Sequence, residues 1–149
     1  MRNKSVVFDI DKTLSWGEQR VHLLPSKEVR NIDSAWDEFN LAAGGDAPIP
    51  ENIELLNCLS KSYKVIILTA RSEVCRGVTE EWLSVNGVIY DELVMRGIGD
   101  CRNDACLKAE FLLPMRDEVL CCFDDQPSVC KAISDIGIPC HLVSKPEFL

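Results

Sequence analysis

Residues 5–14 of this chain read SVVFDIDKTL, an apolar run that ends in two aspartates spaced two residues apart. A short continuous apolar run followed by polar side chains is typical of a strand that is buried on both faces of a sheet. On an extended backbone, residues two apart point the same way, so Asp9 and Asp11 can face one site. This stretch therefore predicts a central strand, with two carboxylates at the edge of the sheet where ligands bind.

Four further apolar runs alternate with helical patterns, which favours a parallel sheet covered by helices on both faces. The runs predict strands at residues 63–68, 92–95, 119–123 and 139–143. The apolar spacing predicts helices at residues 50–60, 73–86, 104–113 and 127–136, the second with Val74, Val78, Trp82 and Val85 on its apolar face. The expected fold class is α/β, a Rossmann-like three-layer sandwich around a central parallel sheet.

The 149 residues fit one compact domain, which we expect to span residues 1–149. Residues 15–50 are broken by glycines and prolines and are expected to form a lid or wall with one short helix at residues 34–43. A segment of this size covers a site only in part, so we expect a small or absent cap. Trp16 either stacks on a base or simply packs, whereas Trp36 is expected in the core.

The chain carries 16 Lys and Arg against 24 Asp and Glu, a formal net charge of −8. This balance argues against an extended nucleic-acid footprint, which depends on neutralising phosphates with basic residues. No apolar stretch reaches the roughly 20 residues of a membrane helix, and the N-terminus lacks the pattern of a signal peptide, so we expect a cytoplasmic protein with no membrane partner. The eight cysteines form no Cys-x-x-Cys pair, which favours reduced thiols over a zinc site.

Polar side chains follow three of the predicted strands and should meet at one edge of the sheet: Asp9 and Asp11, then Thr69 and Arg71, then Asp124 and Asp125. Carboxylates gathered in this way can share Mg²⁺, which prefers oxygen ligands. One carboxylate can attack phosphorus if it is ionised, while its neighbour must hold a proton, which requires a raised pKa. Lys108 can supply the positive charge that phosphoryl transfer needs.

Residues 8–14, FDIDKTL, resemble the Asp-x-Asp-x-Thr signature of the haloacid dehalogenase (HAD) superfamily, whose members are mostly phosphatases. Residues 68–71 are similar to the second motif of that superfamily, Lys108 to the third, and residues 123–125 to the fourth. The four motifs occur in the family's order and cover nearly the whole chain. The aspartate at position 11 favours phosphatases over dehalogenases within this superfamily.

The resemblance implies a role for each matched residue. Asp9 would be the nucleophile that forms an aspartyl-phosphate, and Asp11 the general acid and then the base that activates water. Thr69 and Lys108 would hold the phosphoryl group. The implied Mg²⁺ ligands are Asp9, the backbone carbonyl of Asp11, and Asp124 with or without Asp125.

The stretch between the second and fourth motifs resembles the 3′-phosphatase domain of phage polynucleotide kinase-phosphatases, whose arginines matching Arg71, Arg96 and Arg102 line the active site. The stretch differs at Ala105, where a second acidic residue is usual, and the chain contains no Gly-x-x-x-x-Gly-Lys-Ser/Thr kinase motif. Lys12 stands where glycine is commoner and could narrow the entrance or contact phosphate. The residues expected to bind substrate are Lys12, Thr13, Ala70, Arg71, Arg96 and Arg102.

The resemblance thus implies a Mg²⁺-dependent phosphomonoesterase that removes 3′-phosphates from nucleic-acid ends. Two alternatives remain open at the level of the sequence. One is a nucleotidase or small-metabolite phosphatase, which the acidic charge and small size would suit. The other is a non-catalytic phosphoacceptor module, which would explain acidic strand ends but not the spacing of Asp9 and Asp11.

Overall fold

The computed structural model describes residues 4–144 of the chain. Its centre is a five-stranded parallel sheet of order β5-β4-β1-β6-β7, built from β1 (Ser5–Phe8), β4 (Lys64–Ser72), β5 (Glu92–Arg96), β6 (Val119–Asp124) and β7 (Cys140–Leu142). The strand order reverses between β1 and β6, and open parallel sheets bind their ligands beyond the strand ends at such a switch point. The predicted α/β class and its parallel sheet are confirmed.

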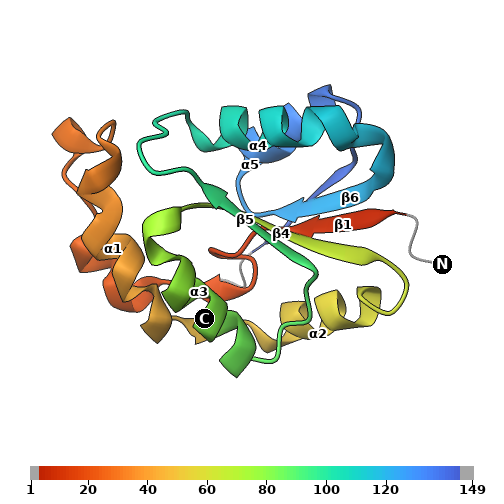
Figure 1. Ribbon diagram of the computed structural model, residues 1–149, viewed down its shortest axis with the longest axis horizontal. Helices are drawn as coiled ribbons and strands as arrows, with labels where there is room; N and C mark the ends of the chain where they lie inside the picture. Colours follow the sequence, from red (N-terminus) through yellow and green to blue (C-terminus); the bar gives the residue numbers. More distant parts are fainter. Residues whose placement is uncertain (1–3, 145–149) are drawn as a thin grey trace.

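Helices cover both faces of the sheet (Figure 1). On one face lie α2 (Pro50–Leu59) and α3 (Arg76–Val85), and on the other lie α4 (Asp104–Leu112) and α5 (Pro127–Asp135). Alternate residues of β1 serve the two layers, because successive side chains of a strand point to opposite faces. Val6 and Phe8 pack in the core beneath α2 and α3, whereas Val7 packs in the core beneath α4 and α5.

Among the strands and helices of the three layers, β4 and α3 differ from their predicted bounds by three or more residues at one end. β4 continues to Ser72, so Thr69 and Arg71 lie within the strand, and its register with β5 shifts after Leu68. The apolar face predicted for residues 73–86 is wrong at Val74 and Val85, which are 36% and 78% exposed. The 3₁₀ helix η5 (Glu73–Cys75) precedes α3, and α3 buries the predicted Trp82 together with Thr79 and Leu83.

The irregular part of the chain, which we call the 15–48 segment, begins and ends in one small antiparallel pair, β2 (Ser15–Trp16) and β3 (Ala47–Pro48). Between these strands lie α1 (Asp37–Leu41) and four 3₁₀ helices: η1 (Glu18–Leu23), η2 (Lys27–Val29), η3 (Asp33–Trp36) and η4 (Ala42–Gly45). The helix expected at residues 34–43 is therefore present but divided. Figure 1 shows the segment beside the carboxyl ends of the strands.

All eight cysteines lie among the described residues and are free thiols. Within residues 4–144, no helix combines the length and apolar character that a membrane crossing requires.

Candidate active site

Asp9 follows β1 directly and is 5% exposed. Its backbone N–H donates to the carbonyl oxygen of Phe123 in β6 at 3.0 Å, which ties the ends of the two switch-point strands together. Its carboxylate accepts a hydrogen bond from Thr13 Oγ1 at 3.3 Å and one from Lys108 Nζ at 2.9 Å. The predicted nucleophile is therefore held between the loop after β1 and the helix α4.

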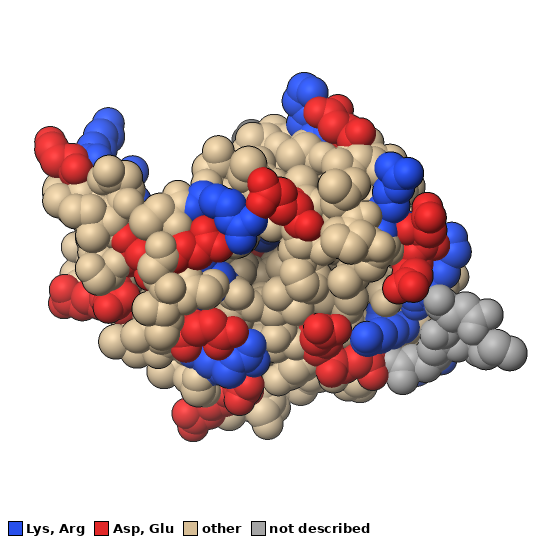
Figure 2. Space-filling model, turned by 45° about the horizontal axis from the view of Figure 1, so that its top comes forward, with Lys and Arg blue, Asp and Glu red and all other residues tan. Residues whose placement is uncertain are grey.

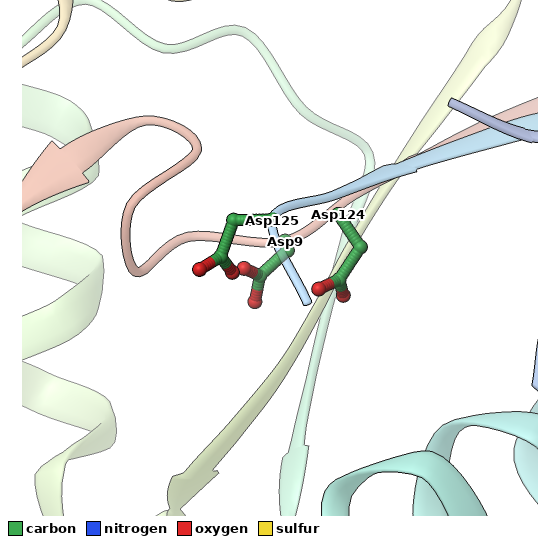
Figure 3. Close-up of side chains that lie close together, drawn as sticks. All are labelled: Asp9, Asp124 and Asp125. Carbon is green, nitrogen blue, oxygen red and sulfur yellow. The ribbon is translucent and has the colours of Figure 1, made fainter. Parts of the chain in front are cut away.

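Asp9, Asp124 and Asp125 form an acidic group at the switch point, and one carboxylate oxygen of each lies within 4.8 Å of the others (Figure 3). Lys108, buried on α4, bridges Asp9 at 2.9 Å and Asp124 at 2.7 Å. The group thus holds three carboxylates and one ammonium, which contacts two of them, so negative charge is in excess in a largely buried place. Hard oxygen donors suit Mg²⁺ better than zinc, so these residues fit the cation that the sequence predicts.

The charges of this group shift one another's pKa values. Burial raises the pKa of Asp9 well above its usual value; Lys108 lowers it in part, and Asp124 raises it again. Burial also raises the pKa of Asp125. Burial alone would lower the pKa of Lys108, but the Asp9 and Asp124 carboxylates outweigh it and raise that pKa. A divalent cation within the group would favour ionised carboxylates, the form that a nucleophile needs.

The Asp11 carboxylate lies with two arginines instead of with the acidic group. It accepts hydrogen bonds from Arg71 Nε at 3.1 Å, Arg71 Nη2 at 2.9 Å and Arg20 Nη2 at 2.5 Å. Burial alone would raise the pKa of Asp11, but Arg71, with Arg20, outweighs it and lowers the pKa to about 2. The expectation of a raised pKa is therefore wrong for this arrangement. Coordination of a metal by the Asp11 backbone carbonyl stays a prediction.

Arg20 and Asp46, both in the 15–48 segment, complete this buried cluster. Arg20 is 1% exposed and donates Nε and Nη2 to Asp46 at 2.9 Å each, while Arg71 Nη2 reaches Asp46 at 3.3 Å. Gly17 leaves room for the guanidinium, since a Cβ there would lie 3.2 Å from Arg20 Nε. Reasoning from the sequence missed Arg20 and Asp46 because neither belongs to a motif or a periodic pattern, and no local signal would have found them.

A cavity of about 880 Å³ opens beside Asp9, between the 15–48 segment and the body of the domain. Figure 2 shows the molecule hollowed there. Thr13 and Thr69 are fully buried and do not line this cavity. Thr69 instead lines a cavity of about 390 Å³, and its hydroxyl accepts from the backbone N–H of Arg71. The predicted site residues that do line the large cavity are Asp9, Asp11, Lys12, Ala70, Arg71, Arg96, Arg102 and Lys108.

Arg96 and Arg102 are held by residues near them in the chain. Arg96 donates to the Asp104 carboxylate at 2.9 Å and to the carbonyl oxygen of Asp100 at 3.0 Å. Arg102 pairs with Asp100 at 2.6 Å and with Glu110. Both guanidiniums therefore reach the cavity already paired with carboxylates, and their contact with substrate stays a prediction.

A family model described as the polynucleotide kinase PNKP phosphatase domain matches residues 3–148. The chain belongs to this family. The match confirms the resemblance on which the site was first assigned, and with it a HAD-type phosphatase domain. The first, third and fourth motifs of this PNKP-type domain meet at Asp9, and the second meets Asp11 through Arg71. A comparison with curated protein sequences gives no match.

Two solved structures of Pnkp1/Rnl/Hen1 complexes share this fold. One matches with a TM-score of 0.76 and 26% identity over 95% of this chain. The other, titled an RNA repair complex, matches with a TM-score of 0.75 and 28% identity over 99% of this chain. The PNKP-type domain spans only 46% and 44% of those chains, less than half of their length.

A HAD family enzyme from Bacteroides thetaiotaomicron, solved with magnesium and inorganic phosphate, matches the PNKP-type domain with a TM-score of 0.56. Its identity is 14%, over 95% of this chain and 94% of that one, so this likeness shows the fold alone. The HAD-like architecture expected from the sequence is confirmed, and a magnesium complex exists within that fold.

Proposed function

We propose that this domain hydrolyses phosphate monoesters at the 3′ ends of nucleic acids, with Mg²⁺ as cofactor and Asp9 as nucleophile. The observation that carries the proposal is the placement of Asp9 against Lys108 at 2.9 Å, within a group of three carboxylates at the switch point of a PNKP-family domain. The nucleophile, the ammonium and the carboxylate oxygens thus lie together, and Asp9 and Lys108 line the cavity. These groups support the reaction class, and membership of the family supports a substrate with a polynucleotide end.

In the first step, a carboxylate oxygen of Asp9 attacks phosphorus, and the bond from phosphorus to the leaving 3′ oxygen breaks. The Lys108 ammonium offsets the charge that builds on the phosphoryl oxygens. Mg²⁺, held by Asp9, Asp124, Asp125 and the backbone carbonyl of Asp11, would supply further positive charge to those oxygens. The product of this step is an aspartyl-phosphate on Asp9 and a free 3′ hydroxyl once the leaving oxygen gains a proton.

In the second step, Asp11 takes a proton from water, whose oxygen attacks phosphorus. The bond from phosphorus to Asp9 breaks, which restores the carboxylate and releases inorganic phosphate. Arg20 and Arg71 orient Asp11 and keep it ionised, the state that can accept a proton, while the lowered pKa makes it a weaker base than a free carboxylate. The resemblance also gives Asp11 the role of acid in the first step, for which it must carry a proton, and the two arginines disfavour its protonated form. The need for that proton should be largest for leaving groups of high pKa.

The leaving group offers a test of these two roles. We expect Asp11→Asn to lower turnover of a 3′-phosphorylated oligonucleotide by about 10²–10⁴-fold, the usual range for general acid–base catalysis. With p-nitrophenyl phosphate, whose leaving group needs no proton, the variant should still form phosphoenzyme and then hydrolyse it slowly. Rapid-quench detection of phosphoprotein measures this. Equal loss of phosphoenzyme formation with both substrates would contradict the acid role.

The substrate is tested by turnover of four compounds: a 3′-phosphorylated oligonucleotide, the same oligonucleotide with a 5′-phosphate, a 3′-mononucleotide and p-nitrophenyl phosphate. We expect the first to have the highest kcat/KM, and chelation of Mg²⁺ to abolish turnover of all four. Equal or better turnover of the mononucleotide would favour the nucleotidase alternative. A stable phosphorylated protein without turnover would favour a phosphoacceptor module.

The nucleophile is tested by Asp9→Asn, which should abolish turnover because an amide cannot form the acyl phosphate. Asp117→Asn, at a side chain that is 97% exposed, serves as the matched control and should keep full activity. Circular dichroism should show that both variants fold. Hydrolysis retained by folded Asp9→Asn would mean that another group attacks phosphorus.

A further inference from the structure

Seven basic side chains line the 880 Å³ cavity, and they divide into two sets. Four of them pair with carboxylates: Arg71, Arg96, Arg102 and Lys108. The other three, Lys12, Lys27 and Arg30, form no ion pair with any residue that the structure describes. An unpaired cation in a cavity is free to meet an anionic ligand at little cost, whereas a paired one must first give up its carboxylate.

The 15–48 segment forms one wall of the cavity, and Lys27 and Arg30 lie on it. They belong to other elements than Asp9, Asp124 and Asp125 and are distant from them in the sequence. Both are exposed, and Arg30 uses only its Nε, which donates to the carbonyl oxygen of Pro25 at 3.0 Å. Its two terminal nitrogens therefore keep the fork that matches phosphate oxygens. Lys12, by contrast, directly follows Asp11 and belongs to the loop that carries Asp9 and Asp11.

Trp36 lines the same wall, although the sequence placed it in the core. Its indole Nε1 donates to the carbonyl oxygen of Arg30 at 3.0 Å, and its ring meets Phe39 edge-on, with centroids 5.8 Å apart. These contacts fix the half-buried indole next to the turn that carries Arg30. A fixed aromatic face beside unpaired cations is the combination on which single-stranded nucleic acids stack and bind.

Acidic residues limit how far such a surface extends. Glu28 and Asp33 line the same cavity, and Asp33 accepts the backbone N–H of Gly99 at 2.7 Å, which joins the 15–48 segment to the loop between β5 and α4. The wall therefore offers positive charge only around Lys27 and Arg30 and not along an extended groove. This agrees with a net charge of −8, which disfavours a long footprint.

We propose that Lys27, Arg30 and Trp36 form a second subsite, which binds the internucleotide phosphodiester and the base next to the terminal phosphate. The inference rests on the proposed function, since it takes Asp9 to act on a terminal phosphate. Lys27 and Arg30 meet the phosphodiester oxygens, and the Trp36 ring stacks on the base. A mononucleotide has no second phosphate to bind here. The subsite therefore makes the domain prefer an oligonucleotide, by lowering the KM for it.

The test compares kcat/KM for a 3′-phosphorylated trinucleotide with that for p-nitrophenyl phosphate, in the wild type and in the double variant Lys27→Ala, Arg30→Ala. We expect the ratio to fall about tenfold in the variant, through KM of the trinucleotide, and the salt dependence of that KM to weaken. Trp36→Ala should lower the ratio as well, while Trp36→Phe, which keeps an aromatic face, should preserve most of it.

The matched control is Arg116→Ala, Lys131→Ala, which removes the same charge from exposed positions outside the cavity. A control that lowers the ratio as much as the double variant would assign the effect to bulk charge and overturn the subsite. An unchanged ratio in the double variant would overturn it too, while leaving the proposed function intact. If the wild type hydrolyses none of these esters, the proposed function itself fails.

Discussion

Asp11 shows at the scale of one residue how neighbours decide the state of a carboxylate. Its sequence position, two after Asp9, says that both side chains reach one site, but not which charges meet them there. In the fold, Arg20 arrives from the 15–48 segment and Arg71 from β4, and both donate to Asp11. The pKa of Asp11 is lowered as a result, against the sequence-based expectation.

The lowered pKa of Asp11 predicts a pH dependence of stability. Its value of about 2 in the folded protein lies below the ordinary 3.8, so the unfolded chain takes up the proton first as the pH falls. The stability that Asp11 contributes is therefore present above about pH 4 and is lost toward pH 2. We expect the difference in urea midpoint between wild type and Asp11→Asn, measured without metal, to stay constant above pH 4.5 and to shrink below it. A difference that persists unchanged to pH 2.5 would contradict the ion-pair account.

Lys12 has a backbone conformation that is unusual for a residue with a side chain. Its φ is +64°, the left-handed region in which residues other than glycine are strained by roughly 1–2 kcal/mol. Glycine, the commoner residue here in the superfamily that the motifs resemble, avoids that strain but adds freedom to the unfolded chain. We expect Lys12→Gly to stay within about 1 kcal/mol of the wild type, and Lys12→Val to be less stable than both, because β-branched side chains fit this region worst. Thermal unfolding measures the stability of the three proteins. A Lys12→Val variant as stable as Lys12→Gly would contradict backbone strain at this position.

At the scale of elements, the 15–48 segment is tied to the sheet through charged groups rather than through a broad apolar face. Asp46 accepts from Arg20 and Arg71, and its backbone carbonyl accepts from Trp82 Nε1 at 2.8 Å. This explains why α3 buries Thr79, whose hydroxyl accepts from Arg71 at 3.2 Å. Hydrophobic periodicity cannot show such an arrangement, and it therefore placed Val85 on the wrong face of the helix.

The same ties predict the cost of removing Asp46. Asp46→Ala leaves two buried guanidiniums without one of their carboxylates, and breaking a buried pair in this way typically costs about 3–5 kcal/mol. We expect the free energy of unfolding to fall by about that amount in urea titrations. Glu38→Ala, at an exposed position of the same segment, should change it by less than about 0.5 kcal/mol. Equal stability of the two variants would show that the charged cluster does not anchor the segment.

At the scale of the whole molecule, the order of strands brings Asp9 and Asp125 together although more than a hundred residues separate them. The fold thereby holds three carboxylates that repel one another, a repulsion that Lys108 offsets in part and that a divalent cation would offset further. Stability and metal binding are therefore linked, because a ligand that binds only the folded state stabilises it.

This linkage predicts opposite effects of one substitution with and without metal. Because burial raises the pKa of Asp125, its charge destabilises the folded protein at neutral pH. Without metal, Asp125→Asn should therefore be at least as stable as the wild type. With Mg²⁺ at about 100 times its dissociation constant, the wild type should gain about 2.7 kcal/mol, and the variant should gain less. Thermal unfolding with and without Mg²⁺ measures both, and equal gains would place the metal elsewhere.

The sequence by itself determined the layered fold and the core of the site. Continuous apolar runs predict doubly buried strands because only such strands need apolar side chains on both faces, and parallel strands bring Asp9 and Asp124 to one edge of the sheet. The resemblance of Lys108 to the third motif added the helix residue that meets them there. The tertiary structure alone decided which charges meet. Arg20 on Asp11, Asp46 between two arginines, and Lys27, Arg30 and Trp36 on the cavity wall all come from an irregular segment without periodicity. Arg71 lies 60 residues from Asp11 and 25 from Asp46, and contacts between charged side chains so far apart in the chain leave no local pattern to read.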